Sequence, residues 1–195
     1  FVTGLTATPR RRDGLHPILE MQIGPIRYAI DPKSEAARRP FEQRLIVRET
    51  AFTGTSLDPH HGIQGLYGAL AADEQRNRVI LDDVVHALKE KRSPILLTER
   101  KDHVEHLATQ LRPFVKHLVV LRGGMTPRER REVAAQLANI PDSEPRLVVA
   151  TGRYIGEVFY DARLYSLFLT MPVSWKGSLV QYAGRLDRLH PDKTE

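Results

Sequence analysis

The chain has 195 residues, of which 41% are hydrophobic and 27% charged, and its formal net charge is +5. These fractions are ordinary for a folded globular protein and exclude global disorder, while the absence of cysteine excludes disulfides, thiolate metal sites and a cysteine nucleophile. No apolar run approaches the ~20 residues that span a bilayer and no signal-peptide pattern is seen, so we expect a cytoplasmic protein with no membrane partner. The pI of about 9.6 permits a polyanionic partner. A genome whose base composition favours arginine codons would explain the excess of arginine equally well.

The first forty residues predict a tail rather than a domain. The apolar run Phe1–Leu5 resembles a strand that continues from a preceding segment, so we expect a fragment of a longer protein. Prolines and glycines interrupt the stretch that follows, and residues 31–40 contain two prolines and two adjacent arginines, which is typical of a linker. We therefore expect residues 1–42 to be a tail plus linker, and residues 43–195 to form the domain proper.

Two elements are expected before residue 93. Gln43–Phe52 alternates in hydropathy and predicts a strand, and Gly54–Gly65 predicts a loop. From Leu66 to Leu88 the apolar residues recur at helical spacing, which predicts a helix with one apolar face.

From residue 93 onward strands and helices alternate. The expected strands cover 94–98, 117–121, 146–150 and 164–171, and the expected helices cover 102–111, 126–138 and 177–185. Thr126 and Glu129 form a capping-box pattern with Pro127 at the first helical position, which indicates a helix start. Such alternation produces crossover units, so the expected fold class is α/β, with a parallel sheet flanked by helices on both faces.

Polar residues follow the expected strands. In parallel sheets ligands bind at the carboxyl ends of the strands, so these residues are candidates for a site. They are Thr98, Glu99, Arg100, Arg122, Gly123, Gly124, Thr151, Gly152, Arg153 and the loop 174–177. For each of them an ordinary strand-end turn is an equally good interpretation.

The last expected helix carries a basic face. Gln181, Arg185 and Arg188 lie three and four residues apart and share one side of the helix. An anion held by bidentate hydrogen bonds would relieve the repulsion between the two guanidiniums. On spacing alone, a solvated arginine face with Asp187 as a local partner explains the pattern equally well.

Four segments together resemble one family. Gln181–Arg188 matches the pattern Q-x-x-G-R-x-x-R, and residues 5–14 read LTATPRRRDG. Residues 148–152 read VVATG and precede Gly156 and Glu157, while residues 95–98 read ILLT. These are similar to motifs VI, III, V and IV of superfamily 2 (DEAD/DEAH-like) helicases and translocases, and the wording is closest to bacterial helicases of mobile-element and phage-conflict systems. The resemblance implies a RecA-like second helicase domain, as in P-loop NTPases, over residues 43–195, and the tail of a first RecA-like domain over residues 1–42.

The resemblance implies a shared ATP site. In such helicases ATP and Mg²⁺ bind between two RecA-like domains, and the first domain supplies the phosphate loop and the acidic metal site. The catalytic residues implied here are the arginine fingers Arg185 and Arg188, with Gln181 beside them. The implied ATP-binding residues are Gly156, Glu157, Asp161 and Gly184. The N-terminal RecA-like domain of the full-length protein is thus an expected partner.

The resemblance also implies nucleic acid as a partner, held by its backbone with little sequence preference. The implied contacts are Thr98, Arg100, Arg122, Gly123, Thr151 and Gly152. Motif III residues that couple the ATP state to the grip on nucleic acid correspond to Thr6, Thr8 and Arg10. No metal ligands are expected within this chain, and its histidines are expected in loops and on the surface.

Two departures from the family pattern favour an alternative. The chain contains neither a G-x-x-x-x-G-K-[ST] phosphate loop nor a D-E-x-x box, so it should not hydrolyse ATP alone. Motif V normally continues G-E-G-x-D, but Val158 and Tyr160 stand at its second glycine and its carboxylate, and Asp161 comes one place late. A degenerate module that binds nucleic acid or a protein without hydrolysis is therefore the second hypothesis. The third hypothesis is an unrelated phosphate-binding α/β enzyme. The chain contains no complete phosphate loop or catalytic dyad to support it.

Overall fold

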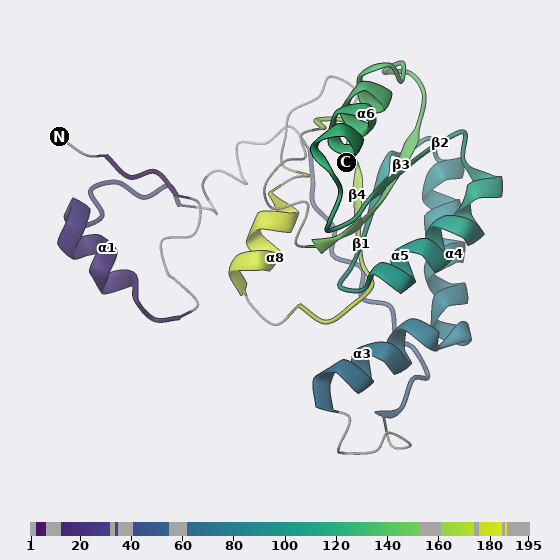
Figure 1. Ribbon diagram of the computed structural model, residues 1–195, viewed down its shortest axis with the longest axis horizontal. Helices are drawn as coiled ribbons and strands as arrows, with labels where there is room; N and C mark the ends of the chain where they lie inside the picture. Colours follow the sequence, from purple (N-terminus) through teal and green to yellow (C-terminus); the bar gives the residue numbers. More distant parts are fainter. Residues whose placement is uncertain are drawn as a thin grey trace.

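A four-stranded parallel sheet forms the centre of the protein (Figure 1). The computed structural model describes residues 3–6, 13–31, 34, 41–54, 62–152, 161–173, 176–184 and 186. Its strands are β1 (Pro94–Thr98), β2 (His117–Leu121), β3 (Arg146–Thr151) and β4 (Ser166–Leu169). They lie in the order β2-β3-β1-β4, and every neighbouring pair is parallel. The expected α/β class with a parallel sheet is confirmed.

The two central strands are buried along their whole length. All residues of β1 and β3 are buried, and Ile95 pairs with Val148 while Thr98 pairs with Thr151. Continuous apolar runs of this kind are typical of strands that are covered on both faces. The register brings the carboxyl ends of β1 and β3 level with each other.

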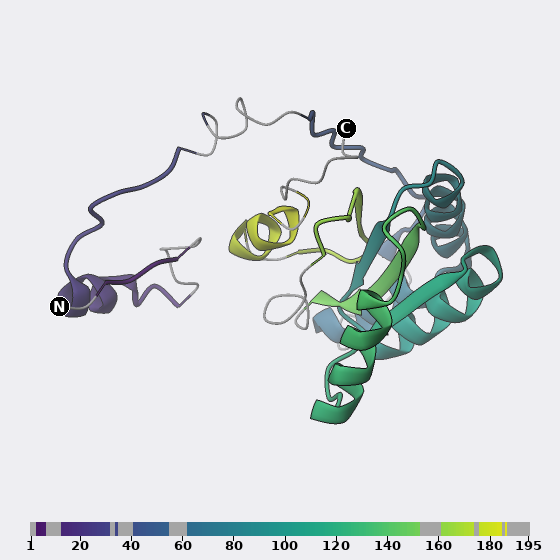
Figure 2. The same ribbon diagram turned by 90° about the horizontal axis from the view of Figure 1, so that it is seen from above.

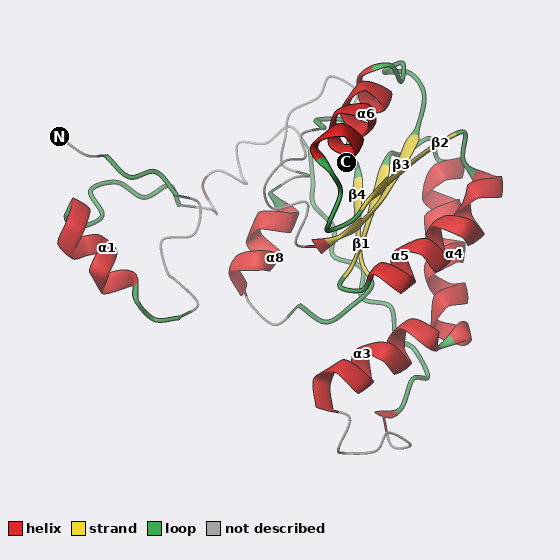
Figure 3. Cartoon of the chain, viewed as in Figure 1, coloured by secondary structure: helices red, strands yellow, loops and turns green. Residues whose placement is uncertain are grey.

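Helices cover both faces of the sheet (Figure 3). On one face, α4 (Glu74–Lys89) and α5 (Lys101–Leu111) pack against Leu96, Leu147 and Val149. On the other face, α6 (Pro127–Ala138) and α8 (Lys176–Ala183) pack on a cluster that includes Ile95 and Val148. The short 3₁₀ helix η3 (Arg112–Phe114) leads from α5 to β2. None of the described helices is long and apolar enough to cross a membrane.

Helix caps explain where the helices begin. The capping box at α6 is confirmed, since the Thr126 hydroxyl accepts from the Glu129 amide and the Glu129 carboxylate accepts from the Thr126 amide. The expected single helix over 66–88 is wrong, because the segment forms α3 (Gly62–Ala72) and α4. Asp73 lies between them with an extended backbone, and its carboxylate accepts from the Arg76 amide at 2.6 Å. Aspartate is favoured as an N-cap, so it starts a new helix here.

The N-terminal region lies apart from the sheet (Figures 1 and 2). Its helix α1 (His16–Ile23) buries no residue. The strand expected at Gln43–Phe52 is wrong, because this segment is extended but has no strand partner among the described residues, and Leu45 is 92% exposed. Within this segment, the guanidinium of Arg48 pairs with Asp83 of α4, and the Arg48 Nε lies 2.7 Å from a carboxylate oxygen. Likewise, the described part of the expected N-terminal strand, residues 3–6, is not in a sheet.

Candidate functional site

The residues that follow β1, β2 and β3 meet at one edge of the sheet, which we call the carboxyl edge. The order of the strands places β3 between β1 and β2, so the turns after the three strands are neighbours. The Gly123 amide after β2 donates to the Thr151 hydroxyl at the end of β3, at 3.3 Å. Thr151 and Gly152 are both buried. The structure thus brings together Thr98, Gly123 and Thr151, three of the strand-end residues that the sequence predicts for a site.

Lys101 is a cation of this edge that sequence reasoning missed. A β-carbon placed on Gly124 would lie 3.4 Å from the Lys101 Nζ, and one on Gly123 would lie 3.9 Å from its Cε. Gly124 has φ of +89°, a conformation that favours glycine. The lysine therefore extends across a glycine turn, where backbone and ammonium are both accessible. The one feature of the sequence that could have indicated Lys101 as part of the site is its position directly after Arg100.

Thr98 belongs to a buried polar chain. It is 1% exposed, and its hydroxyl lies 2.9 Å from His103 Nδ1. His103 Nε2 lies 3.0 Å from the Asn77 side-chain oxygen, while the Asn77 amide nitrogen donates to the Ala71 carbonyl at 2.8 Å. Because that oxygen can only accept, Nε2 carries the proton and Nδ1 accepts from the threonine hydroxyl. The chain of bonds ties the end of β1 to α5 and to the start of α4.

The expectation that the histidines lie in loops and on the surface is wrong for His103, which is 1% exposed. Burial, with a smaller contribution from the charge of Arg76, lowers the pKa of His103 from 6.5 to about 4. The ring is therefore neutral at neutral pH, as its hydrogen bonds require.

Arg100 and Arg122, the two nominated cations, are both held by carboxylates of α5. Arg100 donates from Nε to Asp102 at 3.0 Å and from Nη2 at 2.6 Å. These hydrogen bonds are the main cause of the lowered pKa of Asp102. Arg122 donates to Glu105 at 2.6 Å, and both of those side chains are about half exposed. Neither pair is buried enough to be fixed in place.

Gly152 marks a close approach between the end of β3 and α8. A β-carbon at this position would lie 2.4 Å from the Tyr182 Oη and 2.7 Å from a Glu99 carboxylate oxygen. Burial, and then the charge of Glu99, raises the pKa of Tyr182. Tyr182 is 7% exposed and attaches α8 to the core, while its neighbour Gln181 is exposed, as is Gly184 just beyond the helix.

Asp161 lies at the opposite edge, where the strands begin. Its carboxylate accepts from Arg163 Nε at 2.8 Å and lies 3.7 Å from Nη1 of Arg146, the first residue of β3. Arg163 also donates to the Ile140 carbonyl and to Asp142. Asp161, the candidate to replace the missing motif V aspartate, thus already has two arginine partners. Its contact with ATP stays a prediction.

Several nominated residues lie outside the described part of the chain. They are Thr8, Arg10, Gly156, Glu157, Arg185 and Arg188. Thr6 is described and exposed. Among the described residues, no group of three or more histidine, aspartate or glutamate side chains could hold a metal ion.

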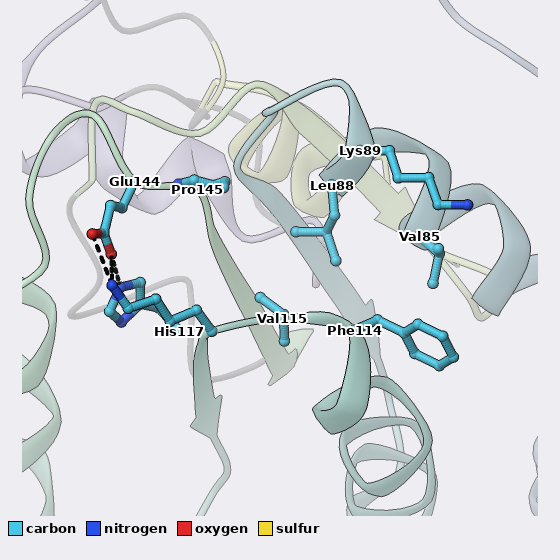
Figure 4. A pocket seen from close by; sticks show the side chains of 9 residues that line it. Val85, Leu88, Lys89, Phe114, Val115, His117, Glu144 and Pro145 are labelled. Carbon is cyan, nitrogen blue, oxygen red and sulfur yellow. Dashed lines mark hydrogen bonds and ion pairs between the residues drawn. The ribbon is translucent and has the colours of Figure 1, made fainter.

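A hollow of about 270 Å³ lies at the same edge as Asp161, between the end of α4 and the start of β2 (Figure 4). Val85, Leu88 and Phe114 supply apolar walls, and Glu144 accepts from Lys116 at 2.8 Å beside it. No nominated residue lines this hollow, so it does not belong to the candidate site.

Comparison with known proteins finds the same fold. No family model and no curated protein matches the chain. The C-terminal part of the Fun30 ATPase domain matches 63% of the chain with a TM-score of 0.51 and 10% identity. T4 UvsW matches 64% of it with a TM-score of 0.52 and 16% identity. A third structure, the DUF1998 helicase MrfA bound to DNA and AMPPNP, matches 59% of the chain with a TM-score of 0.47 and 24% identity.

These likenesses confirm the fold as RecA-like α/β, the fold of helicase ATPase domains. The chain covers 41% of the Fun30 structure and 24% of UvsW, so it spans less than half of either. The narrower resemblance to helicases of bacterial conflict systems stays a prediction.

Proposed function

We propose that residues 43–195 are the second RecA-like domain of an ATP-dependent nucleic-acid helicase or translocase, and that residues 1–42 are the tail of the first domain plus a linker. The observation that carries the proposal is the carboxyl edge of the sheet. It gathers the motif IV and motif V residues of the family resemblance on a fold shared with the C-terminal part of the Fun30 ATPase domain. The exposed apolar residues of the N-terminal region, such as Met21 and Tyr28, fit a segment that packs on a first domain.

The residues of the carboxyl edge would divide into two roles. Thr98 and Thr151 are buried and hydrogen-bonded, so they would hold the turns in position. Arg100 and Arg122 reach solvent and carry the charge that phosphates require. Contacts of this kind address the nucleic-acid backbone, so binding should be salt-dependent and tolerant of sequence.

Arg185 and Arg188 would act as arginine fingers on ATP held mainly by the first domain, with Gln181 beside them. A guanidinium stabilises the charge that develops on the transferred phosphoryl group, and a finger supplied from another domain is worth roughly a thousandfold or more in rate. Gly156, Glu157 and Gly184 would face the nucleotide. Asp161 would have to leave its two arginines to do so.

The proposal is tested by adding a first RecA-like domain that has an intact phosphate loop and acidic box. We expect no Mg²⁺-dependent ATP hydrolysis by the 195-residue chain alone, and nucleic-acid-stimulated hydrolysis once the first domain is present. Arg185→Ala or Arg188→Ala should abolish that stimulated hydrolysis. Arg112→Ala, an exposed arginine in η3 at the opposite edge, is the matched control and should change nothing. Unchanged activity in both finger variants would refute the assignment.

The second candidate is a non-hydrolysing module that binds nucleic acid or a partner protein. Val158 and Tyr160 in motif V favour it. In that case salt-dependent binding to a single strand would persist, but no hydrolysis would appear with the first domain present. Val158→Gly combined with Tyr160→Asp would then be expected to restore turnover.

A further inference from the structure

We propose that Asp102 and Glu105 on α5 set the affinity of the carboxyl edge for nucleic acid by competing with phosphates for Arg100 and Arg122. The inference rests on the proposed function and adds an internal competitor to it. The two carboxylates lie three residues apart, within the first two turns of one helix, and so point to the same side of it.

The geometry of the Arg100 pair resembles the way an arginine binds a phosphate. Arg100 makes a forked contact, with Nε 3.0 Å from one oxygen of Asp102 and Nη2 2.6 Å from the other. Arg122 crosses from the end of β2 to reach Glu105 on α5 at 2.6 Å. Two-oxygen recognition is what makes arginine suited to phosphate, so Asp102 occupies the donors of Arg100 that a phosphate would use, and Glu105 occupies one donor of Arg122.

Both pairs are open to exchange. The side chains of Arg122 and Glu105 are 49% and 52% exposed, and those of Arg100 and Asp102 are 30% and 62% exposed. Exposed ion pairs contribute little to stability, so breaking one to admit a phosphate costs little. The carboxylate that is left behind nevertheless repels the incoming phosphate across a short distance.

Lys101 provides the contrast. It lies over the Gly124 turn, and among the described residues it has no carboxylate partner. Among the described cations of this edge, Lys101 can meet a phosphate without changing partners, while Arg100 and Arg122 must exchange theirs. The affinity of the site is therefore lower than its count of basic residues suggests.

The experiment measures binding of a fluorescein-labelled oligothymidylate single strand to the 195-residue chain by anisotropy, at low and at high salt. Glu105→Gln keeps the shape of the side chain and removes its charge. Glu90→Gln is the matched control, because it also removes a carboxylate from an arginine, Arg92, but at the other edge of the sheet, where Glu90 contacts His86 as well. Both variants raise the net charge by one, so a general charge effect would appear equally in both.

We expect Glu105→Gln to tighten binding about two- to fivefold at low salt and Glu90→Gln to leave it nearly unchanged. The gain should shrink at high salt, where exposed charges are screened, and most of it should disappear in an Arg122→Ala background. Asp102→Asn should act in the same direction through Arg100.

Three results would contradict the inference in distinguishable ways. If the unmodified chain binds but Glu105→Gln and Glu90→Gln gain equally, the competitor role is refuted while the proposed function stands. An undiminished gain in the Arg122→Ala background would also refute it, because the carboxylate would then act without its arginine. If neither the unmodified chain nor any variant binds a single strand even at low salt, the nucleic-acid role fails and the inference fails with it.

Discussion

The two edges of the sheet use the same chemical groups, arginine and carboxylate, in opposite ways. At the amino edge the side chains of Arg146 and Asp161 are 0% and 4% exposed and lie against each other in the interior. At the carboxyl edge the side chains of Arg122 and Glu105 are 49% and 52% exposed. A buried charge depends on its partner, whereas an exposed one can exchange its partner for water or a ligand.

This difference separates stability from function along a single sheet. The amino edge fixes how the loop before β4 packs on the end of α6, because Arg163 donates to the carbonyls of Leu137 and Ile140. The carboxyl edge holds its backbone with buried hydroxyls and leaves its guanidiniums accessible. Substitutions at the amino edge should therefore change the free energy of unfolding, and substitutions at the carboxyl edge should change the binding of nucleic acid.

The largest effect is expected for Asp161→Asn. Arg146 is fully buried, its Nε and Nη1 have no hydrogen-bond partner, and the substitution removes the nearest opposite charge. Burial lowers the pKa of Arg146, and arginine stays charged in proteins. We expect the free energy of unfolding to fall by about 3–5 kcal/mol, measured by urea titration followed by circular dichroism.

Glu105→Gln at the other edge is the matched control for that measurement. It also removes one carboxylate from an arginine, and it should change the free energy of unfolding by less than about 1 kcal/mol. Asp142→Asn, which removes the exposed second partner of Arg163, should behave like the control. Equal losses in Asp161→Asn and Glu105→Gln would show that burial does not distinguish the two edges.

The buried histidine of the carboxyl edge, His103, should make the free energy of unfolding depend on pH. The pKa of His103 is about 4 in the folded protein and 6.5 in its ordinary state, so between these values the unfolded chain binds a proton that the folded chain does not. The free energy of unfolding should therefore fall as the pH decreases from about 6.5 to about 4, by up to about 3 kcal/mol in all.

His103→Gln should remove this contribution, because glutamine does not titrate. The quantity to compare is the change in unfolding free energy between pH 7 and pH 4 for the two proteins, which cancels the titration of other groups. His86→Gln, whose parent side chain is 74% exposed, is the control for the loss of a histidine from the surface. An identical pH dependence in His103→Gln and the unmodified chain would contradict the assignment of a neutral, buried ring.

Local patterns allowed most of the sheet domain to be predicted. The strand at 117–121 and the capped start of α6 were both correct, because hydropathy period and capping depend on neighbours in the sequence. The rule that parallel strands end at a common edge also placed Thr98 near Thr151 correctly. The predictions that were wrong depended on partners that are distant in the sequence. Gln43–Phe52 alternates like a strand, but no strand of the described chain pairs with it.

The same limit applied to the charged groups. Periodicity could not indicate that Arg122 pairs with Glu105, seventeen residues away, or that Asp161 belongs to Arg146. Nor could it show that His103 is buried, since its partners Thr98 and Asn77 come from β1 and α4. Which arginine is accessible to a ligand is decided by such long-range contacts, so the composition of the chain alone overstated its free positive charge.

The smallest effect is expected from a pair of glycine substitutions that test how tightly the carboxyl edge holds its backbone. Helix propensity favours alanine over glycine by up to about 1 kcal/mol, so Gly68→Ala in α3, where a β-carbon meets only Arg100 Nη1 at 3.9 Å, should stabilise the protein slightly. Gly152→Ala would place the same atom 2.4 Å from the Tyr182 Oη. Such overpacking typically costs about 1–3 kcal/mol, and it should also loosen α8. Adding Tyr182→Phe removes the nearest clashing atom and should recover part of the loss. If both alanine variants change the free energy of unfolding in the same direction, the carboxyl edge is not held by close packing against α8, and its buried groups are as free to move as its arginines.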